Sequence, residues 1–214
     1  MKRSLLFLPF VLAACDRATT GPGDHPLFAA TTALAAVRAI ACFSGPSEGT
    51  AFGGTCTLTP TGVATLDNID DNPNGAFSGV FARNGNLRGK LLADVAELGF
   101  RYAGSPATGG APRISLPLDT DGDGLTDVYA FIGAFHCNDE ASAVPSVVDA
   151  INDPTCTIFD GNEISGHANW AAFAEAHPTY TVGPDGAPPF VIADEPGVWT
   201  VSNVRLGRGA AGGL

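Results

Sequence analysis

Basic residues are scarce in this chain of 214 residues. Lys and Arg together number 11 against 22 Asp and Glu, so the formal net charge is −11. After Lys2, the only lysine is Lys90. A surface this acidic repels phosphate backbones and anionic headgroups, so the composition argues against a nucleic-acid-binding protein.

Long apolar runs are also missing. The longest one extends from Ser4 to Leu12, is interrupted by Pro9, and is too short to cross a bilayer as a helix. It follows the basic pair Lys2-Arg3, and this order is typical of a cleaved export signal.

The apolar run ends in Leu12-Ala13-Ala14-Cys15, which resembles the lipobox of bacterial lipoproteins. The resemblance implies that residues 1–14 are a signal peptide that is removed. It also implies that Cys15 is lipidated and anchors the protein to the membrane on the extracytoplasmic side of the cell envelope.

The rest of the chain divides by composition. Residues 15–26 lack a periodic apolar pattern, so we expect a flexible tether. The folded domain is expected over residues 27–207, where 45% hydrophobic and 15% charged content for the chain is enough for one buried core. Residues 208–214 are expected to form a disordered tail.

Cysteine spacing does not favour a zinc site. Beyond Cys15 the chain contains four cysteines without a C-x-x-C pair, and its four histidines are scattered. An even number of cysteines in an exported chain predicts two disulfides, for which three connectivities exist. We favour Cys42–Cys56 and Cys137–Cys156, because each pair closes a short loop within one half of the chain.

Turn residues are abundant, with 27 Gly and 16 Pro, and this favours short strands over long helices. Eight or so short strands predict a mostly β fold, an antiparallel, jelly-roll-like β-sandwich with one or two short helices. Residues 57–59 and 63–66 flank Pro60-Thr61-Gly62 and predict a hairpin. Pro117 cannot donate to a neighbouring strand, so the strand over residues 113–118 is expected at an edge or with a bulge.

One helix is predicted over residues 169–177. Trp170, Phe173, Ala174 and His177 recur at helical spacing, and Pro178 ends the run.

The segment from Asp119 to Asp127 is the one place where spacing dictates chemistry. Its carboxylates alternate along the chain with glycines where the backbone must turn, and a cation is needed to neutralise them. The predicted calcium ligands are Asp119, Asp121, Asp123, the Leu125 carbonyl and Asp127, and Asp139 or Glu140 are the nearest carboxylates that could complete the shell. Apolar, β-branched residues follow, so the chain leaves the loop as a strand.

This loop resembles the Asp-rich calcium loops of dockerins, thrombospondin type 3 repeats and integrin-type propeller repeats. Those families repeat the loop, whereas this chain has it once. The resemblance covers nine residues and implies a structural Ca²⁺, but it names no family for the globular domain. The spacing of residues 77–118 also resembles that of carbohydrate-binding jelly rolls, which often hold such an ion.

Catalytic motifs are few. No serine lies in a nucleophile elbow, and the cysteines are expected to be oxidised. Paired carboxylates for polysaccharide hydrolysis remain an alternative whose test is their separation. The available carboxylates are Asp139, Glu140, Asp160, Glu163, Glu175, Asp194 and Glu195.

Aromatic side chains could stack on sugar rings, although in a β-sandwich they more often fill the core. The residues in question are Trp170, Trp199, Tyr102, Tyr129 and Tyr180. The preferred hypothesis is a lipid-anchored, calcium-stabilised binding module for a glycan or an envelope protein. A calcium-dependent hydrolase and a structural envelope protein without a ligand site are the alternatives.

Overall fold

The computed structural model describes residues 40–45, 53–68, 76–82, 86–106, 111–137, 146–161 and 166–207. The predicted signal peptide, lipidation site, tether and tail lie outside these residues, as do Asp139, Glu140 and Glu163.

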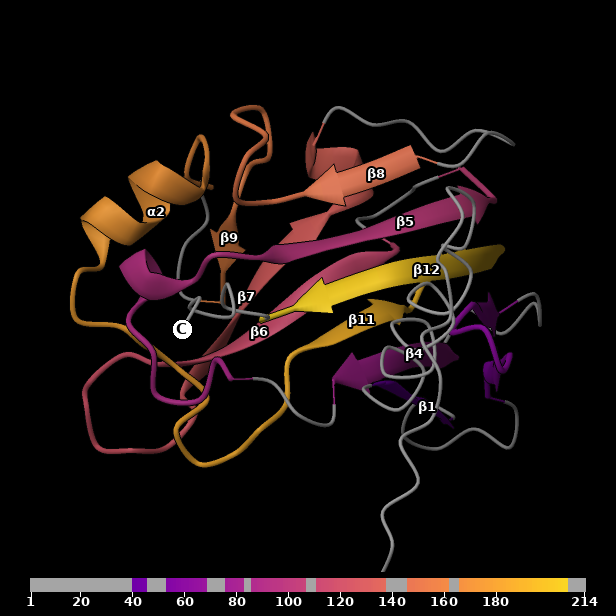
Figure 1. Cartoon of the computed structure of the whole chain (residues 1–214), viewed down its shortest axis with the longest axis horizontal. Helices are drawn as coiled ribbons and strands as arrows, with labels where there is room; N and C mark the ends of the chain where they lie inside the picture. Colours follow the sequence, from indigo (N-terminus) through magenta and orange to yellow (C-terminus); the bar gives the residue numbers. More distant parts are fainter. Residues whose placement is uncertain are drawn as a thin grey trace, which may run out of the picture.

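The described residues form two antiparallel sheets that pack face to face, so the predicted β-sandwich is confirmed. The strands of the first sheet, in spatial order, are β1 (Ile40–Gly45), β4 (Phe77–Ala82), β11 (Phe190–Ala193), β6 (Arg113–Asp119), β7 (Val128–Gly133) and β9 (Phe159–Asp160), with β10 (Thr181–Val182) also paired to β6. The second sheet contains β2 (Thr55–Leu58), β3 (Ala64–Asp67), β12 (Val198–Leu206), β5 (Leu98–Gly104) and β8 (Ser146–Asp149). In Figure 1, strands β12, β5 and β8 cross in front of β11, β6 and β7.

The core lies between the sheets because each strand alternates apolar side chains toward the other sheet. Ile114, Leu116 and Leu118 of β6 are all fully buried. Phe100 and Tyr102 of β5 are buried on the facing side, with ring centroids 5.8 Å apart. Large side chains from both sheets thus fill one apolar layer.

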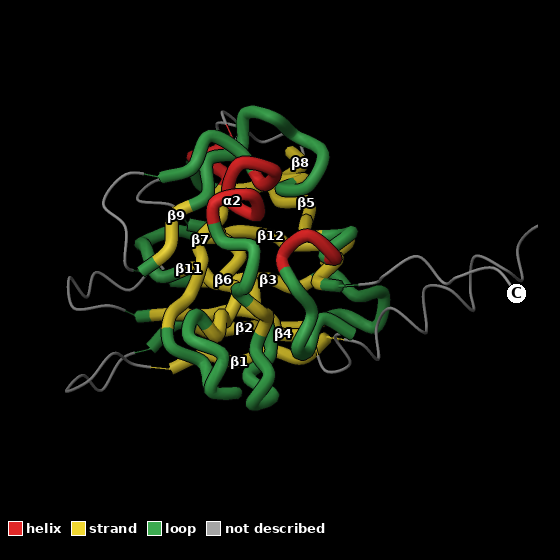
Figure 2. The backbone as a smooth tube through the Cα atoms, turned by 90° about the vertical axis from the view of Figure 1, so that its left-hand side faces the viewer, coloured by secondary structure: helices red, strands yellow, loops and turns green. Residues whose placement is uncertain are grey.

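In the described residues the helical segments are short, and Figure 2 shows them in red beside the strands. The helix α2 (Trp170–Ala176) confirms the predicted helix, and the 3₁₀ turns are η1 (Leu92–Asp94) and η2 (Ala134–Cys137). In the described part of the chain, no helix has the length and apolarity needed to cross a membrane.

The expectation that Pro117 marks an edge strand or a bulge is wrong, because β6 lies inside the first sheet, with an unbroken register to β7. Its neighbour on the opposite side changes along its length: β11 pairs as far as Ser115, and β10 pairs from Leu118 onward. The Pro117 carbonyl accepts from the Gly183 amide at 2.9 Å. Its missing N–H faces that same side, one residue beyond the end of β10, where the Gly183 carbonyl accepts from the Gly186 amide at 3.1 Å instead.

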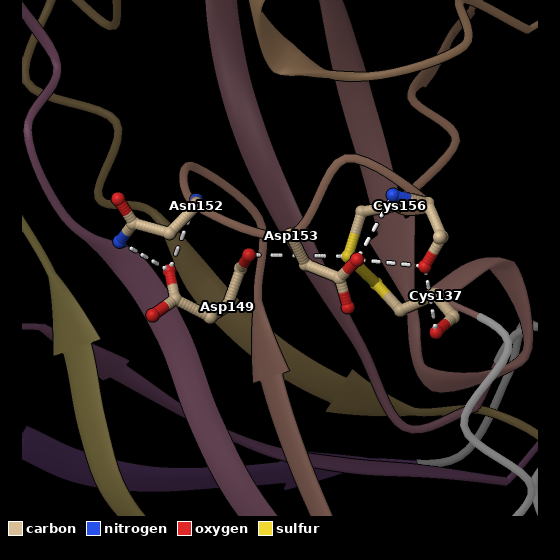
Figure 3. Close-up of a disulfide and its surroundings, with 6 residues drawn as sticks. Cys137, Asp149, Asn152, Asp153 and Cys156 are labelled. Carbon is tan, nitrogen blue, oxygen red and sulfur yellow. Dashed lines mark hydrogen bonds between the residues drawn. A yellow bond between two sulfur atoms is a disulfide. The ribbon is translucent and has the colours of Figure 1, made fainter.

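Both predicted disulfides are present in the structure. Cys42–Cys56 joins β1 of the first sheet to β2 of the second. Cys137–Cys156 joins the end of η2 to the loop between β8 and β9, where the Cys156 amide also donates to the Asp153 carbonyl (Figure 3). Disulfides persist in oxidising compartments, so this pair indicates an extracytoplasmic environment.

Candidate metal site and outer aromatic face

The Asp-rich loop connects two paired strands. Strand β6 ends at Asp119 and β7 begins at Val128, whose partner in the register is Leu118. The Asp127 amide donates to the Leu118 carbonyl at 2.8 Å and closes the loop at its base. The first and last carboxylates of the predicted ligand set are therefore brought to the same end of the hairpin.

Backbone amides shape the loop around Asp119, which is 3% exposed. Its two carboxylate oxygens accept from the amides of Gly122 at 2.7 Å and Gly124 at 3.1 Å. Both glycines have positive φ, 81° and 89°, a conformation that other residues rarely adopt. The sequence Asp-Gly-Asp-Gly thus folds the loop back over its own first carboxylate.

Three of the predicted ligands converge. Carboxylate oxygens of Asp119, Asp121 and Asp127 lie within 4.8 Å of one another, which is close enough for one cation to contact all three. Ligands made only of oxygen suit hard cations such as Ca²⁺ and Mg²⁺. The described loop therefore has the chemistry of a cation site, and these three ligands alone do not identify the ion.

The remaining two predicted ligands are not part of this group. The Asp123 carboxylate accepts from the Leu125 amide at 2.8 Å and is not among the three that converge. The Leu125 side chain is a hydrocarbon without a ligand atom, so only the backbone carbonyl of this residue can serve as a ligand. Both assignments stay predictions.

Thr120 holds the Asp127 carboxylate in its ionised form. Its amide and its hydroxyl donate to the same Asp127 oxygen at 2.7 and 2.9 Å, and these bonds lower the pKa of the Asp127 carboxyl. The carboxylate is thus charged and available to a cation at neutral pH.

Asp185 is a neighbouring carboxylate that the sequence analysis did not identify. The Thr126 amide and hydroxyl donate to it at 3.1 and 2.9 Å, and its pKa is lowered, first by the bond from the Ala187 amide and then by the Thr126 hydroxyl. It reaches the loop because β10, which precedes it, pairs with the end of β6. No local pattern carries this information, since the contact spans 59 residues.

Seven aromatic side chains form a second feature, which we call the outer aromatic face. Paired residues on neighbouring strands point to the same side of a sheet, and these side chains lie on the side of the first sheet that faces away from the core. All are half-buried: Phe43, Phe77, Phe81, Tyr129, Phe131, Phe159 and Phe190.

Small residues let these rings lie against the sheet. A Cβ at Gly79 would come within 2.4 Å of the Phe43 ring, so glycine is needed where this ring crosses β4. Ser115 lies on the same side between Phe190 and Phe131 in the register and is only 1% exposed, although it belongs to the outward-facing set. The rings therefore cover the backbone of the sheet.

Ring contacts join the aromatic side chains into a row across the strands. The centroid of Phe190 is 5.5 Å from that of Phe43 and 5.6 Å from that of Tyr129. At one edge the Arg113 guanidinium lies over the Phe131 ring at 5.1 Å and forms a two-pronged ion pair with Asp194.

The other predicted candidates fall in different places. Trp170, Trp199 and Tyr102 are buried in the core, which is the common role for such residues, whereas Tyr129 belongs to the outer aromatic face. Of the carboxylates weighed for hydrolysis, Asp160 is buried and Asp194 is engaged with Arg113.

No family model, curated protein or solved structure matches this chain.

Proposed function

We propose that this protein is a lipid-anchored, calcium-stabilised module of the cell envelope that binds a neutral glycan. The anchor is inferred from the lipobox-like segment that ends at Cys15, and the two disulfides support the compartment. Mass spectrometry of the N-terminal peptide from the membrane fraction tests the anchor, because a free thiol at Cys15 would contradict it.

Calcium is the cation that suits the Asp-rich loop best. Ca²⁺ accepts six to eight oxygens in irregular geometry, whereas Mg²⁺ demands a tight octahedron and releases water reluctantly. A largely exposed loop with three convergent carboxylates fits the first description, with water completing the shell. The ion clips the β6–β7 hairpin, with Asp119, Asp121 and Asp127 as ligands and with Asp123 and the Leu125 carbonyl as further contributors.

The outer aromatic face is the observation that carries the binding function. Its rings are half-buried, and contiguous apolar patches at a protein surface mark interaction sites. Sugar rings present apolar C–H faces that stack on aromatic rings. The planes of Phe43 and Phe190 lie at 87° and those of Phe190 and Tyr129 at 59°, so a sugar stacks on one of these rings and contacts the edges of its neighbours. A net charge of −11 disfavours acidic glycans, so a neutral polysaccharide is the ligand class that fits.

The hydrolase alternative receives less support. It requires two carboxylates that converge on an open cleft at a separation of roughly 5–10 Å. Of the four described candidates, Asp160 is 4% exposed and Asp194 is bound by Arg113, which leaves only Glu175 and Glu195 without such an engagement.

Binding to a panel of neutral polysaccharides, measured by affinity electrophoresis and calorimetry, tests the proposal. Phe190→Leu and Tyr129→Leu keep apolar volume on the sheet but remove a ring. Each is expected to weaken binding about threefold to tenfold, which corresponds to the energy of one aromatic contact. Val147→Ala is the matched control, because Val147 is 38% exposed on β8 of the other sheet and should leave affinity unchanged.

Three results would contradict the glycan proposal. The first is a wild-type protein that binds no neutral polysaccharide, and the second is binding that survives both ring substitutions. The third is concentration-dependent dimerisation that Phe190→Leu abolishes, because a second copy of the chain would then occupy the face.

A further inference from the structure

A pocket of about 200 Å³ lies where the ends of three strands meet. Ala82 at the end of β4 and Val182 at the end of β10 line it, together with Pro188 and Pro189, which precede β11. The Ala82 amide donates to the Pro189 carbonyl at 3.2 Å, and the Gly89 amide donates to the Val182 carbonyl at 2.7 Å. Hydrogen-bonded backbone therefore frames the pocket on two sides.

Most of the pocket lining is apolar. Leu87 and Val182 line it and are each 1% exposed, so core residues supply part of the wall. Pro188 and Pro189 contribute two further rings and have no amide hydrogen to donate to a ligand. Sites for drug-sized ligands typically enclose roughly 300–1,000 Å³, so this pocket suits a smaller molecule with an apolar body.

The one charged side chain in the described lining is that of Arg88. Its Nε donates to the Pro184 carbonyl at 2.6 Å. A Cβ added to Gly186 would lie 3.7, 3.8 and 4.0 Å from Cζ and the two terminal nitrogens of Arg88, so the guanidinium lies flat against this glycine.

The terminal nitrogens of Arg88 have no hydrogen-bond or ion-pair partner among the residues that the structure describes. The bond from Nε and the contact with Gly186 hold the guanidinium in one orientation. A planar fork that is held in place and still has donors to offer matches a carboxylate, which accepts two parallel hydrogen bonds from it.

Local charge at the pocket is positive, although the whole chain is acidic. Lys90 follows Arg88 by two residues, and no described residue of the lining is acidic. Asp185 in the adjoining turn already accepts from the Thr126 and Ala187 amides. The net charge of −11 acts weakly here, because exposed charges more than about 8 Å apart are largely screened at physiological ionic strength.

We infer that this pocket binds a small monocarboxylate, with its carboxylate on the Arg88 fork and its hydrocarbon part against Pro188 and Pro189. A bare anion such as phosphate fits less well, because it loses hydration and gains nothing from apolar walls. The inference does not depend on the glycan proposal, because no residue of the described lining belongs to the outer aromatic face.

A titration of the purified, nitrogen-15-labelled protein with benzoate, followed by NMR, tests the site. The amides of Val182, Gly186 and Ala187 are expected to shift, because these residues line the pocket. Benzamide has nearly the shape of benzoate without its charge and should bind at least about tenfold more weakly, as should benzoate to Arg88→Gln. Arg101→Gln is the matched control, because Arg101 is exposed on β5 of the second sheet and should leave affinity unchanged.

A wild-type protein whose pocket amides do not respond to benzoate would overturn the inference. So would equal affinities for benzoate and benzamide, an unchanged affinity in Arg88→Gln, or inorganic phosphate that binds as tightly as benzoate. Shifts confined to the amides of Phe43 and Tyr129 would place benzoate on the outer aromatic face and would also contradict the pocket. The comparison with benzamide uses the wild type, so the test remains decisive if Arg88→Gln disturbs folding.

Discussion

A single polar side chain, Asn68, ties the two sheets together. It follows β3 of the second sheet and is 2% exposed. Its Nδ2 donates to the Ala193 carbonyl at 2.7 Å and its Oδ1 accepts from the Ser78 hydroxyl at 2.9 Å, both in the first sheet. Buried polar groups cost free energy unless they are paired, so all three residues depend on one another.

Asn68→Ala should therefore lower the free energy of unfolding by about 2–4 kcal/mol, because it leaves the Ser78 hydroxyl and the Ala193 carbonyl buried without this partner. Urea denaturation followed by circular dichroism measures the change. Asn152→Ala removes an exposed amide that bonds only locally to Asp149, and should cost about 0.5 kcal/mol or less. Equal effects of the two substitutions would show that Asn68 does not join the sheets.

For single residues, the sequence predicted sites whose members are close together in the chain and missed contacts between residues far apart in it. The spacing of Asp119, Asp121 and Asp127 identified a cation loop because all the ligands lie within nine residues. Asn68 stood out through no local pattern, and its partner Ala193 is 125 residues away. The four histidines were read as scattered, and the contact of 3.3 Å between the Nε2 atoms of His167 and His177 arises from the fold of the residues on either side of α2.

The helix α2 illustrates how an element depends on its first residue. The Asn169 side chain accepts from the Ala172 amide at 3.0 Å and satisfies an amide that has no partner within the helix. The helix has only seven residues, so it is stabilised mainly by burial of Trp170 and Phe173.

Asn169→Ala is expected to destabilise the protein by about 1 kcal/mol, whereas Asn169→Asp should be nearly neutral because aspartate also caps helices. Thermal denaturation and hydrogen exchange of the α2 amides measure the effect, and faster exchange should be confined to α2 and its neighbours. Unchanged exchange in Asn169→Ala would mean that packing alone fixes the start of the helix.

Strands and helices could be predicted from the sequence where a short stretch of residues carried the pattern. The hairpin of β2 and β3 followed from Pro60-Thr61-Gly62, and α2 followed from its apolar spacing. The pairing of β4 with both β1 and β11 could not be predicted, because register between distant strands is fixed by the packing of the whole sheet. Pro117 was misplaced for the same reason: its tolerance depends on where β11 ends and β10 begins.

Both disulfides and non-covalent packing hold the β-sandwich together. Cys42–Cys56 joins the two sheets directly, and Cys137–Cys156 fixes the segment that leads into β9. Short loop lengths indicated both pairs, but the sequence did not indicate that one of them would cross between sheets. The outer aromatic face was equally hidden, since its rings come from five strands of the first sheet.

Calcium at the Asp-rich loop should stabilise the whole domain by mass action. At a concentration a hundredfold above the dissociation constant, an ion that binds only the folded state adds about 2.7 kcal/mol. For a domain of this size the melting temperature should rise by about 5–10 °C. Magnesium should raise it much less, because it demands octahedral geometry.

Thermal unfolding in Ca²⁺ and in EDTA is the most direct measurement of this cation site. The wild type should melt about 5–10 °C higher in calcium, and the double substitution Asp121→Asn, Asp127→Asn should lose that difference while remaining folded. Asp94→Asn with Glu175→Gln removes the same number of exposed charges elsewhere and should keep the full rise. A wild-type melting temperature that is the same in calcium and in EDTA would show that the loop is an ordinary acidic turn.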